Sequence, residues 1–175
     1  MPTPILNIDD IALSARPPSF APKGELANQF EVRIGRIATL IGARKLGYNI
    51  TAIPPGKSAY PFHSHRRNEE MFFVLQGSGE IRFGPDTFPI RRGDFIACPP
   101  GGPEAAHQMR NTGVEELRFL AVSTVLSPEI NEYPDSGKFG VYADFPSATD
   151  GQMEYFSFQG REAMNLDYWD GEGEQ

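Results

Sequence analysis

The sequence predicts an all-β fold, an antiparallel sandwich or barrel, on three observations. Short apolar stretches follow one another closely between residues 30 and 126, and almost every one ends at Gly, Pro or Asn. The chain holds 18 glycines and 16 prolines, which favour turns and short strands over long helices. Nothing in that region has the spacing of an amphipathic helix. We expect one domain with a sizeable core from 175 residues.

The first elements are an arm and a run of strands. Residues 1–29 are rich in proline and lack periodicity, so we expect an extended arm that wraps its own domain or a neighbouring subunit. From Phe30 the pattern becomes strand-like, because Phe30, Val32 and Ile34 alternate with charged residues. The predicted barrel spans residues 30–127, with its strands in the apolar stretches 34–42, 46–53, 71–77, 79–84, 87–93, 94–102, 107–113 and 116–126.

The chain changes character after Ser127. Residues 128–175 are turn-rich and end in an acidic, aromatic tail, so they are interpreted as a C-terminal extension packed on the barrel. Within this region we expect a single helical turn over residues 127–131 and one more strand over 154–160.

Composition excludes several classes of function. A net charge of −7 and a pI near 5.0 argue against a nucleic-acid partner, which needs a concentrated basic face. No apolar run approaches the roughly 20 residues of a membrane helix, and the N-terminus lacks the pattern of a signal peptide. The lone Cys98 cannot form an intramolecular disulfide, and we predict that it is a small buried residue. A soluble cytoplasmic protein is the prediction.

Two of the three histidines lie one residue apart in the stretch HSHRRNEE, residues 63–70. In a strand, His63 and His65 face the same side, and a turn over residues 66–69 would bring Glu70 back beside them. His107, the third histidine, opens another predicted strand after a loop rich in Pro and Gly. The pattern is typical either of a metal site or of a polar loop that happens to hold two imidazoles.

The spacing around these residues resembles the two conserved motifs of the cupins. Gly56, His63, His65, Glu70 and Gly77 match the first motif, and the second is matched by Gly93, Pro99, Gly101, His107 and Asn111. The resemblance covers roughly residues 35–126. It implies a double-stranded β-helix, the jelly-roll barrel of the cupins, that holds one divalent metal through His63, His65, Glu70 and His107. Glu69 is a rival ligand, and Glu70 is preferred because its six-residue spacing to Gly77 fits the motif.

The ligand set predicts a metal better than it predicts a reaction. Three imidazoles and one carboxylate suit Zn, Fe, Ni or Mn. The chain resembles single-domain cupins labelled sugar-phosphate-isomerase-like, which implies Lewis-acid chemistry on a small oxygenated substrate. A non-haem dioxygenase and a non-catalytic metal-binding module are the alternatives. The resemblance also implies a homodimer. From strand parity and position, Tyr48, Gln76 and Met109 are candidates to line the cavity.

Overall fold

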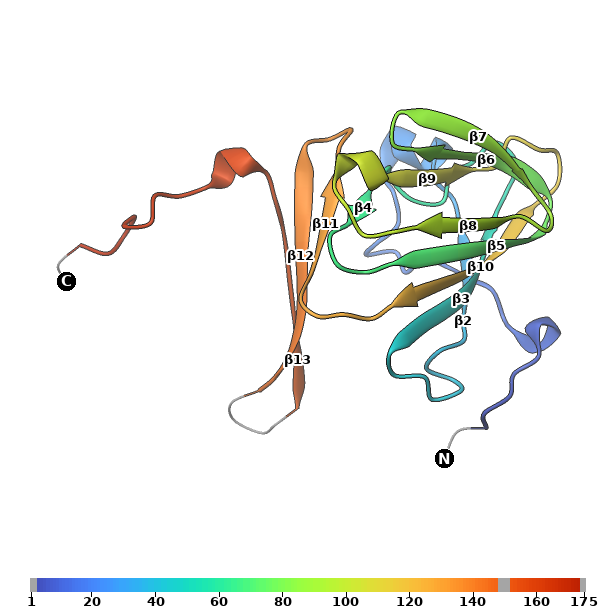
Figure 1. Ribbon diagram of the computed structural model, residues 1–175, viewed down its shortest axis with the longest axis horizontal. Helices are drawn as coiled ribbons and strands as arrows, with labels where there is room; N and C mark the ends of the chain where they lie inside the picture. Colours follow the sequence, from blue (N-terminus) through green and yellow to red (C-terminus); the bar gives the residue numbers. More distant parts are fainter. Residues whose placement is uncertain (1–2, 148–151, 174–175) are drawn as a thin grey trace.

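The structure is a computed structural model that describes residues 3–147 and 152–173. Its described part is all-β, with thirteen strands and four short 3-10 helices (Figure 1). The 3-10 helices span Ile8–Asp10, Gly24–Asn28, Pro103–Ala105 and Glu162–Met164. No helix among the described residues is long and apolar enough to cross a membrane. The predicted fold class is therefore confirmed.

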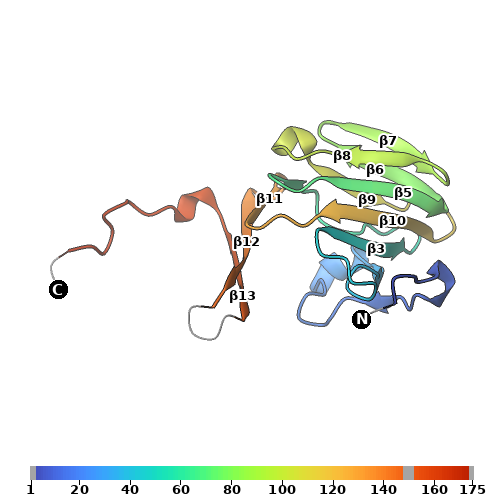
Figure 2. The ribbon, with the colours of Figure 1, turned by 60° about the horizontal axis from the view of Figure 1, so that its bottom comes forward.

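Two antiparallel sheets face each other and form the barrel (Figures 1 and 2). The first has six strands in the order β1-β2-β3-β10-β5-β8, and the second has three in the order β7-β6-β9. The strands of the first sheet are β1 (Ser14–Ala15), β2 (Arg33–Arg36), β3 (Leu46–Ile53), β5 (Glu70–Gln76), β8 (Phe95–Cys98) and β10 (Leu117–Thr124). Those of the second are β6 (Ser78–Phe83), β7 (Asp86–Arg91) and β9 (His107–Arg110).

The core lies between these sheets because alternate residues of each strand point inward. On β3 and β10 the inward positions include Thr51 and Phe119, which are paired across the two strands. The buried cluster takes side chains from both sheets: Val32, Ile53, Ala59, Phe72, Val74, Ile81, Ile90, Cys98, Met109, Leu117, Phe119 and Ala121. This packed interior holds the strands that carry the predicted ligands.

The N-terminal arm packs on its own barrel. Strand β1 pairs with β2 at the edge of the six-stranded sheet. Arg16 donates a hydrogen bond to the carbonyl of Ala59 and lies over the ring of Tyr60, with its Cζ 4.5 Å from the ring centroid. The sequence left open whether this arm wraps its own domain or a neighbouring subunit. In this single chain it packs on its own domain.

A third sheet leads away from the barrel. Its order is β13-β12-β11-β4, with strands β4 (Ser64–His65), β11 (Glu129–Tyr133), β12 (Lys138–Pro146) and β13 (Met153–Gly160). β11 is a strand, so the helical turn expected over residues 127–131 is wrong; its backbone pairs with β4 and β12 instead. β12, β13 and the tail project away from the barrel rather than packing on it as expected (Figure 2). The boundaries at residues 29 and 127 stay a prediction.

Candidate metal centre

His63 and His107 are brought together by backbone pairing. The two residues form an isolated antiparallel bridge, in which His107 N donates to His63 O at 2.8 Å and His63 N donates to His107 O at 3.2 Å. Their ring centroids are 4.8 Å apart. Nδ1 of His63 lies 2.9 Å from Pro61 O, and Nδ1 of His107 lies 3.3 Å from Ala105 O. These carbonyls can accept the Nδ1 protons when a metal is bound, and each Nε2 is then available as a ligand.

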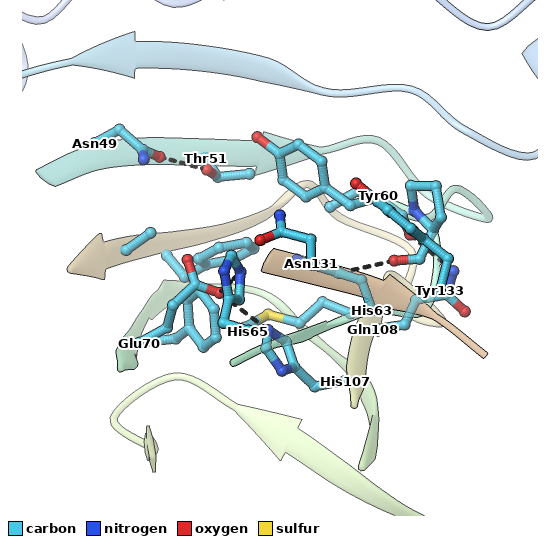
Figure 3. A pocket seen from close by; sticks show the side chains of 16 residues that line it. Asn49, Thr51, Tyr60, His63, His65, Glu70, His107, Gln108, Asn131 and Tyr133 are labelled. Atoms are coloured by element: carbon cyan, nitrogen blue, oxygen red, sulfur yellow. Dashed lines mark hydrogen bonds and ion pairs between the residues drawn. The ribbon is translucent and has the colours of Figure 1, made fainter. Parts of the chain in front are cut away.

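His65 and Glu70 complete the cluster from a neighbouring strand and from the opposite sheet. Glu70 begins β5, and its Oε2 lies 3.0 Å from His107 Nε2 and 3.3 Å from His65 Nε2. One potential ligand atom from each of the four residues lies within 4.8 Å of the other three. His63, His65, Glu70 and His107 thus form a potential metal-binding cluster (Figure 3).

The carboxylate of the cluster comes from Glu70 and not from Glu69, the alternative ligand. The Glu69 side chain is exposed, and its backbone is held by Thr124, whose N donates to Glu69 O at 3.0 Å. Glu69 N in turn donates to Thr124 Oγ1 at 3.0 Å. Because neighbouring residues of a strand point to opposite faces, anchoring Glu69 outside turns Glu70 inward. The geometry therefore agrees with the choice made from the Gly77 spacing.

The protonation states suit a cation ligand set. Burial, reinforced by His107 and His65, lowers the pKa of His63 to about 4, so this imidazole is neutral at pH 7. Burial acts to raise the pKa of Glu70, but the hydrogen bond with His107 Nε2 and the nearby His65 ring outweigh it and hold this pKa well below its usual range. Burial likewise acts to lower the pKa of His65, and the Glu70 carboxylate reverses the effect and raises it. Without a cation, Glu70 relies on imidazole protons for compensation.

The cluster lies in a cavity of about 280 Å³ between the two barrel sheets (Figure 3). Apolar side chains such as Phe72 and Phe119 form its inner part. Polar groups that could contact a ligand come from several strands and from the segment between β3 and β4: Asn49, Thr51, Tyr60, Gln108, Asn131 and Tyr133. Burial raises the pKa of Tyr60, and burial with the Tyr142 hydroxyl raises that of Tyr133. Both phenols therefore stay protonated at neutral pH and can donate hydrogen bonds.

Of the three side chains proposed to line the cavity, the structure places one there. Met109 is buried and lines the cavity on the same face of β9 as His107. Tyr48 does not line it, because the inward positions of β3 are Asn49 and Thr51, so an even-numbered residue faces outward. Gln76 is exposed at the end of β5, after a register shift opposite Arg118 and Phe119 that ends the simple alternation.

The sequence reasoning missed the contribution of β11. Asn131 and Tyr133 line the cavity, and Glu129 is buried beside His65 with 3.8 Å between its Oε2 and His65 Nδ1. These residues lie more than 50 positions beyond His65 along the chain. Their alternation, with Glu129, Asn131 and Tyr133 on one face, was the available signal, but it was interpreted as a helical turn.

The donor set fits a divalent transition metal. Both ring nitrogens of His65 are buried, and neither makes a well-aligned hydrogen bond with a described residue. Buried polar atoms without partners are rare in folded proteins, and a ligand or ion is one explanation. Two further imidazoles and a carboxylate converge on the same point. Nitrogen donors with one carboxylate oxygen suit Zn, Fe, Ni or Mn, so the residues present fit the predicted metal.

Comparison with known proteins agrees with this geometry. Residues 49–123 match the family model described as Cupin domain, a span that runs from the start of the cavity on β3 to β10. Residues 49–123 therefore form a cupin domain. An oxalate-binding protein from Thermotoga maritima is 34% identical to this cupin over 74 residues, which cover 42% of this chain and 58% of that protein. The chain spans about half the length of the curated relatives it matches.

Solved structures share the architecture of this cupin. A sugar phosphate isomerase from a cupin superfamily, from Silicibacter pomeroyi, superposes with a TM-score of 0.70 and 22% identity, over 95% of this chain and 98% of that one. A putative sugar phosphate isomerase from Acidithiobacillus ferrooxidans gives a TM-score of 0.59 and 27% identity, over 72% of this chain and 76% of the other. The first match shows that the fold is shared over nearly the whole length of the chain.

Proposed function

We propose that this cupin binds one divalent transition metal through His63, His65, Glu70 and His107 and uses it to act on a small oxygenated substrate. The observation that carries the proposal is the convergence of four ligand atoms within 4.8 Å at the wall of a cavity. About 280 Å³ is at the lower end of the size of small-molecule sites. Sugar-phosphate-isomerase-like chemistry is the first candidate, by analogy with the named structural neighbours.

The chain itself supplies binding and orientation. A bound divalent metal would act as a Lewis acid that polarises a carbonyl or hydroxyl oxygen. Tyr60 and Tyr133 remain protonated and donate O–H groups to substrate oxygens. Gln108 is held by a 2.7 Å hydrogen bond from its Nε2 to Tyr60 O, which turns its side-chain carbonyl into an acceptor of fixed position. Phe72 and Phe119 exclude water from the inner side of the cavity.

The charge of the lining favours a substrate without a phosphate group. No Lys or Arg is among the described residues that line the cavity. Arg16 and Lys138 contact the rings of Tyr60 and Tyr133 from outside the lining set, with Lys138 Nζ 4.6 Å from the Tyr133 centroid. Phosphate sites usually present Arg, Lys or backbone N–H groups to the phosphate oxygens. A neutral polyol or a hydroxy acid that chelates the metal fits the lining better than a sugar phosphate does.

Two other functions use the same ligands. A non-haem dioxygenase would need the open coordination positions that four protein ligands leave on a six-coordinate metal. A non-catalytic binding module is favoured by a specific observation, since the described lining offers no carboxylate besides Glu70 and no histidine besides the three ligands. A general base for proton transfer would then have to come from a ligand or from the substrate. Oxygen consumption with a panel of polyols and hydroxy acids separates the dioxygenase, and binding without turnover identifies the module.

The metal proposal is tested by elemental analysis of protein purified without added metal. We expect stoichiometric metal in the wild type and its loss in His65→Ala and His107→Ala. Glu69→Ala is the matched control, because this neighbouring carboxylate is exposed and should leave the metal content unchanged. Wild-type protein without metal, even after incubation with Zn²⁺, Ni²⁺, Mn²⁺ or Fe²⁺, would contradict the proposal.

We propose also that the chain acts as a homodimer. β12 and β13 form a two-stranded hairpin whose exposed side chains include Tyr155 and Phe156, consecutive residues that point to opposite faces. Although β12 also pairs with β11, apolar side chains exposed on both faces of the hairpin are typical of an interaction site. The outer face of the six-stranded sheet is also apolar and uncovered around Phe95, which is 73% exposed. A cytoplasmic location stays a prediction from the single cysteine.

A further inference from the structure

Glu129, the first residue of β11, is a buried carboxylate at the back of the metal cluster. Its side chain is largely removed from solvent, and the whole residue is 7% exposed. Four backbone N–H groups donate to it: Asn68 N at 2.8 Å, Ile130 N at 2.8 Å, Arg66 N at 3.1 Å and Arg67 N at 3.2 Å. The Asn68 side chain donates a further hydrogen bond to the same carboxylate. These donors hold the carboxylate in one position.

Three of those N–H groups belong to the connection between two metal ligands. Residues 66–69 join His65 at the end of β4 to Glu70 at the start of β5. A connection with this many polar backbone groups close to the barrel needs acceptors for them. Glu129 supplies the acceptors from the neighbouring strand, since β11 pairs with β4 at Asn131 and His65. The carboxylate therefore sets the path by which the chain passes from one ligand to the next.

The same carboxylate faces the ring of His65. Glu129 Oε2 lies 3.8 Å from Nδ1, whereas Nε2 on the opposite side of the ring faces Glu70 Oε2 at 3.3 Å. His63 and His107 each have a backbone carbonyl at Nδ1. For His65, Glu129 occupies the equivalent position, and Nδ1 makes no well-aligned hydrogen bond with a described residue. Each of the three imidazoles thus has an oxygen behind Nδ1 and is free to present Nε2 to the centre.

We infer that Glu129 is a positioning residue of the metal site, which fixes His65 in the Nδ1–H tautomer and holds the connection between His65 and Glu70. The inference rests on the proposed metal binding. Partners that hold the distal nitrogen of a ligating histidine orient the ring and raise its basicity. β11 lies outside residues 49–123, so the site extends beyond the segment that the family model matches. The C-terminal extension is then part of the metal site as well as a projecting arm.

The test compares Glu129→Gln with Glu132→Gln by calorimetric titration of metal-free protein with Co²⁺. Glu132 is the matched control: it lies on the same strand and holds the same connection through a 2.7 Å contact from Arg66 Nη2, and no contact with His65 is recorded for it. We expect the Kd for Co²⁺ to rise about 10- to 100-fold in Glu129→Gln, the usual effect of losing such a partner, and to change less than about twofold in Glu132→Gln.

A second readout does not depend on affinity. Nitrogen-15 NMR of the Zn²⁺-loaded wild type should show the His65 proton on Nδ1, which faces Glu129, with Nε2 on the side of Glu70 and the other ligands. A proton on Nε2 would overturn the inference, even if Glu129→Gln proves too unstable to purify. Equal Co²⁺ affinities of Glu129→Gln and wild type would also overturn it while leaving the proposed function intact. Failure of the wild type to bind Co²⁺ would overturn both.

Discussion

At the scale of single residues, Cys98 shows how burial decides chemistry beside the cluster. It ends β8 opposite Glu70 in the register of the sheet, and it is 2% exposed. Burial, with a further contribution from the Glu70 charge, raises the pKa of this thiol to about 12. The thiolate is the reactive form, and it is scarcely populated at neutral or mildly alkaline pH. The position of Cys98 near a metal ligand therefore does not make it a nucleophile.

We predict that native protein does not react with a thiol reagent such as dithionitrobenzoate at mildly alkaline pH. The protein unfolded in guanidinium should release one equivalent of the chromophore, because the chain has a single cysteine. In the folded protein the thiol stays protonated until the pH approaches its raised pKa, so it does not react. Unfolding restores the ordinary pKa of a cysteine, and the thiol then reacts. Rapid stoichiometric labelling of the folded protein would show that Cys98 is accessible and ionised.

The candidate ligands could be predicted from sequence, whereas their supporting residues could not. His63, His65, Glu70 and His107 follow from motif spacing, because turns at fixed intervals determine which strands meet. Glu129 depends on pairing between strands far apart in the chain, and no local pattern encodes that pairing. The predicted side-chain directions of Tyr48 and Gln76 were wrong for a similar reason, because both residues face away from the cavity. Parity within a strand gives a direction only once one inward residue is known.

At the scale of elements, two motif glycines have different structural roles. Gly56 and Gly77 both have a φ of +77°, in the left-handed region that other residues avoid. A Cβ added at Gly56 would meet nothing within 4 Å, whereas one at Gly77 would lie 2.5 Å from Glu116 O and 3.0 Å from Leu117 Cα. Gly77 therefore allows both an unusual backbone conformation and the close approach of the segment that leads into β10.

Substituting Gly56 and Gly77 separately distinguishes the cost of the left-handed backbone from the cost of the close approach. We expect Gly56→Ala to lower the free energy of unfolding by about 1 kcal/mol, the cost of the left-handed conformation alone. Gly77→Ala should lower it by roughly 2–4 kcal/mol, because backbone atoms must also move away from the methyl group. Urea denaturation followed by far-ultraviolet circular dichroism measures both. Equal losses in the two variants would mean that β10 accommodates the methyl group without strain.

At the scale of the whole molecule, the chain exposes two apolar surfaces that a single copy leaves uncovered. One is the C-terminal arm, which consists of β12, β13 and residues 161–173 and is distinct from the N-terminal arm. Its Tyr168 and Trp169 are 84% and 72% exposed. The other is the outer face of the six-stranded sheet, opposite the cavity. Two rows cross that face in register: Tyr48, Val122, Met71 and Ala97, then Ile50, Leu120, Phe73 and Phe95. The face is uncovered at its β8 edge, where Phe95 is 73% exposed, whereas Ile50 on β3 is buried. The orientation of Tyr48 away from the cavity is explained by its place in this face.

A second copy can cover both surfaces with one symmetric arrangement. In a two-fold dimer each surface contact occurs twice, so an arm that reaches the partner's sheet face is matched by the reciprocal contact. Exposed apolar patches of this extent are typical of interaction sites in soluble proteins. The arm is part of the fold shared with the structure from Silicibacter pomeroyi, which matches 95% of this chain. We therefore expect a dimer of about twice 19.4 kDa by light scattering at micromolar concentration.

The prediction is sharpest when the two surfaces are altered separately. Phe156→Asp on the arm and Phe95→Asp on the sheet face each place a charge in the expected interface, so each should shift the protein toward monomer. Val114→Asp is the control, since Val114 is 94% exposed in the turn before β10, away from both surfaces. It should stay dimeric with an unchanged unfolding transition. A monomeric wild type, or dimers in all three variants, would rule out this arrangement. Because the metal cluster lies within one chain, Co²⁺ affinity should survive in the monomeric variants.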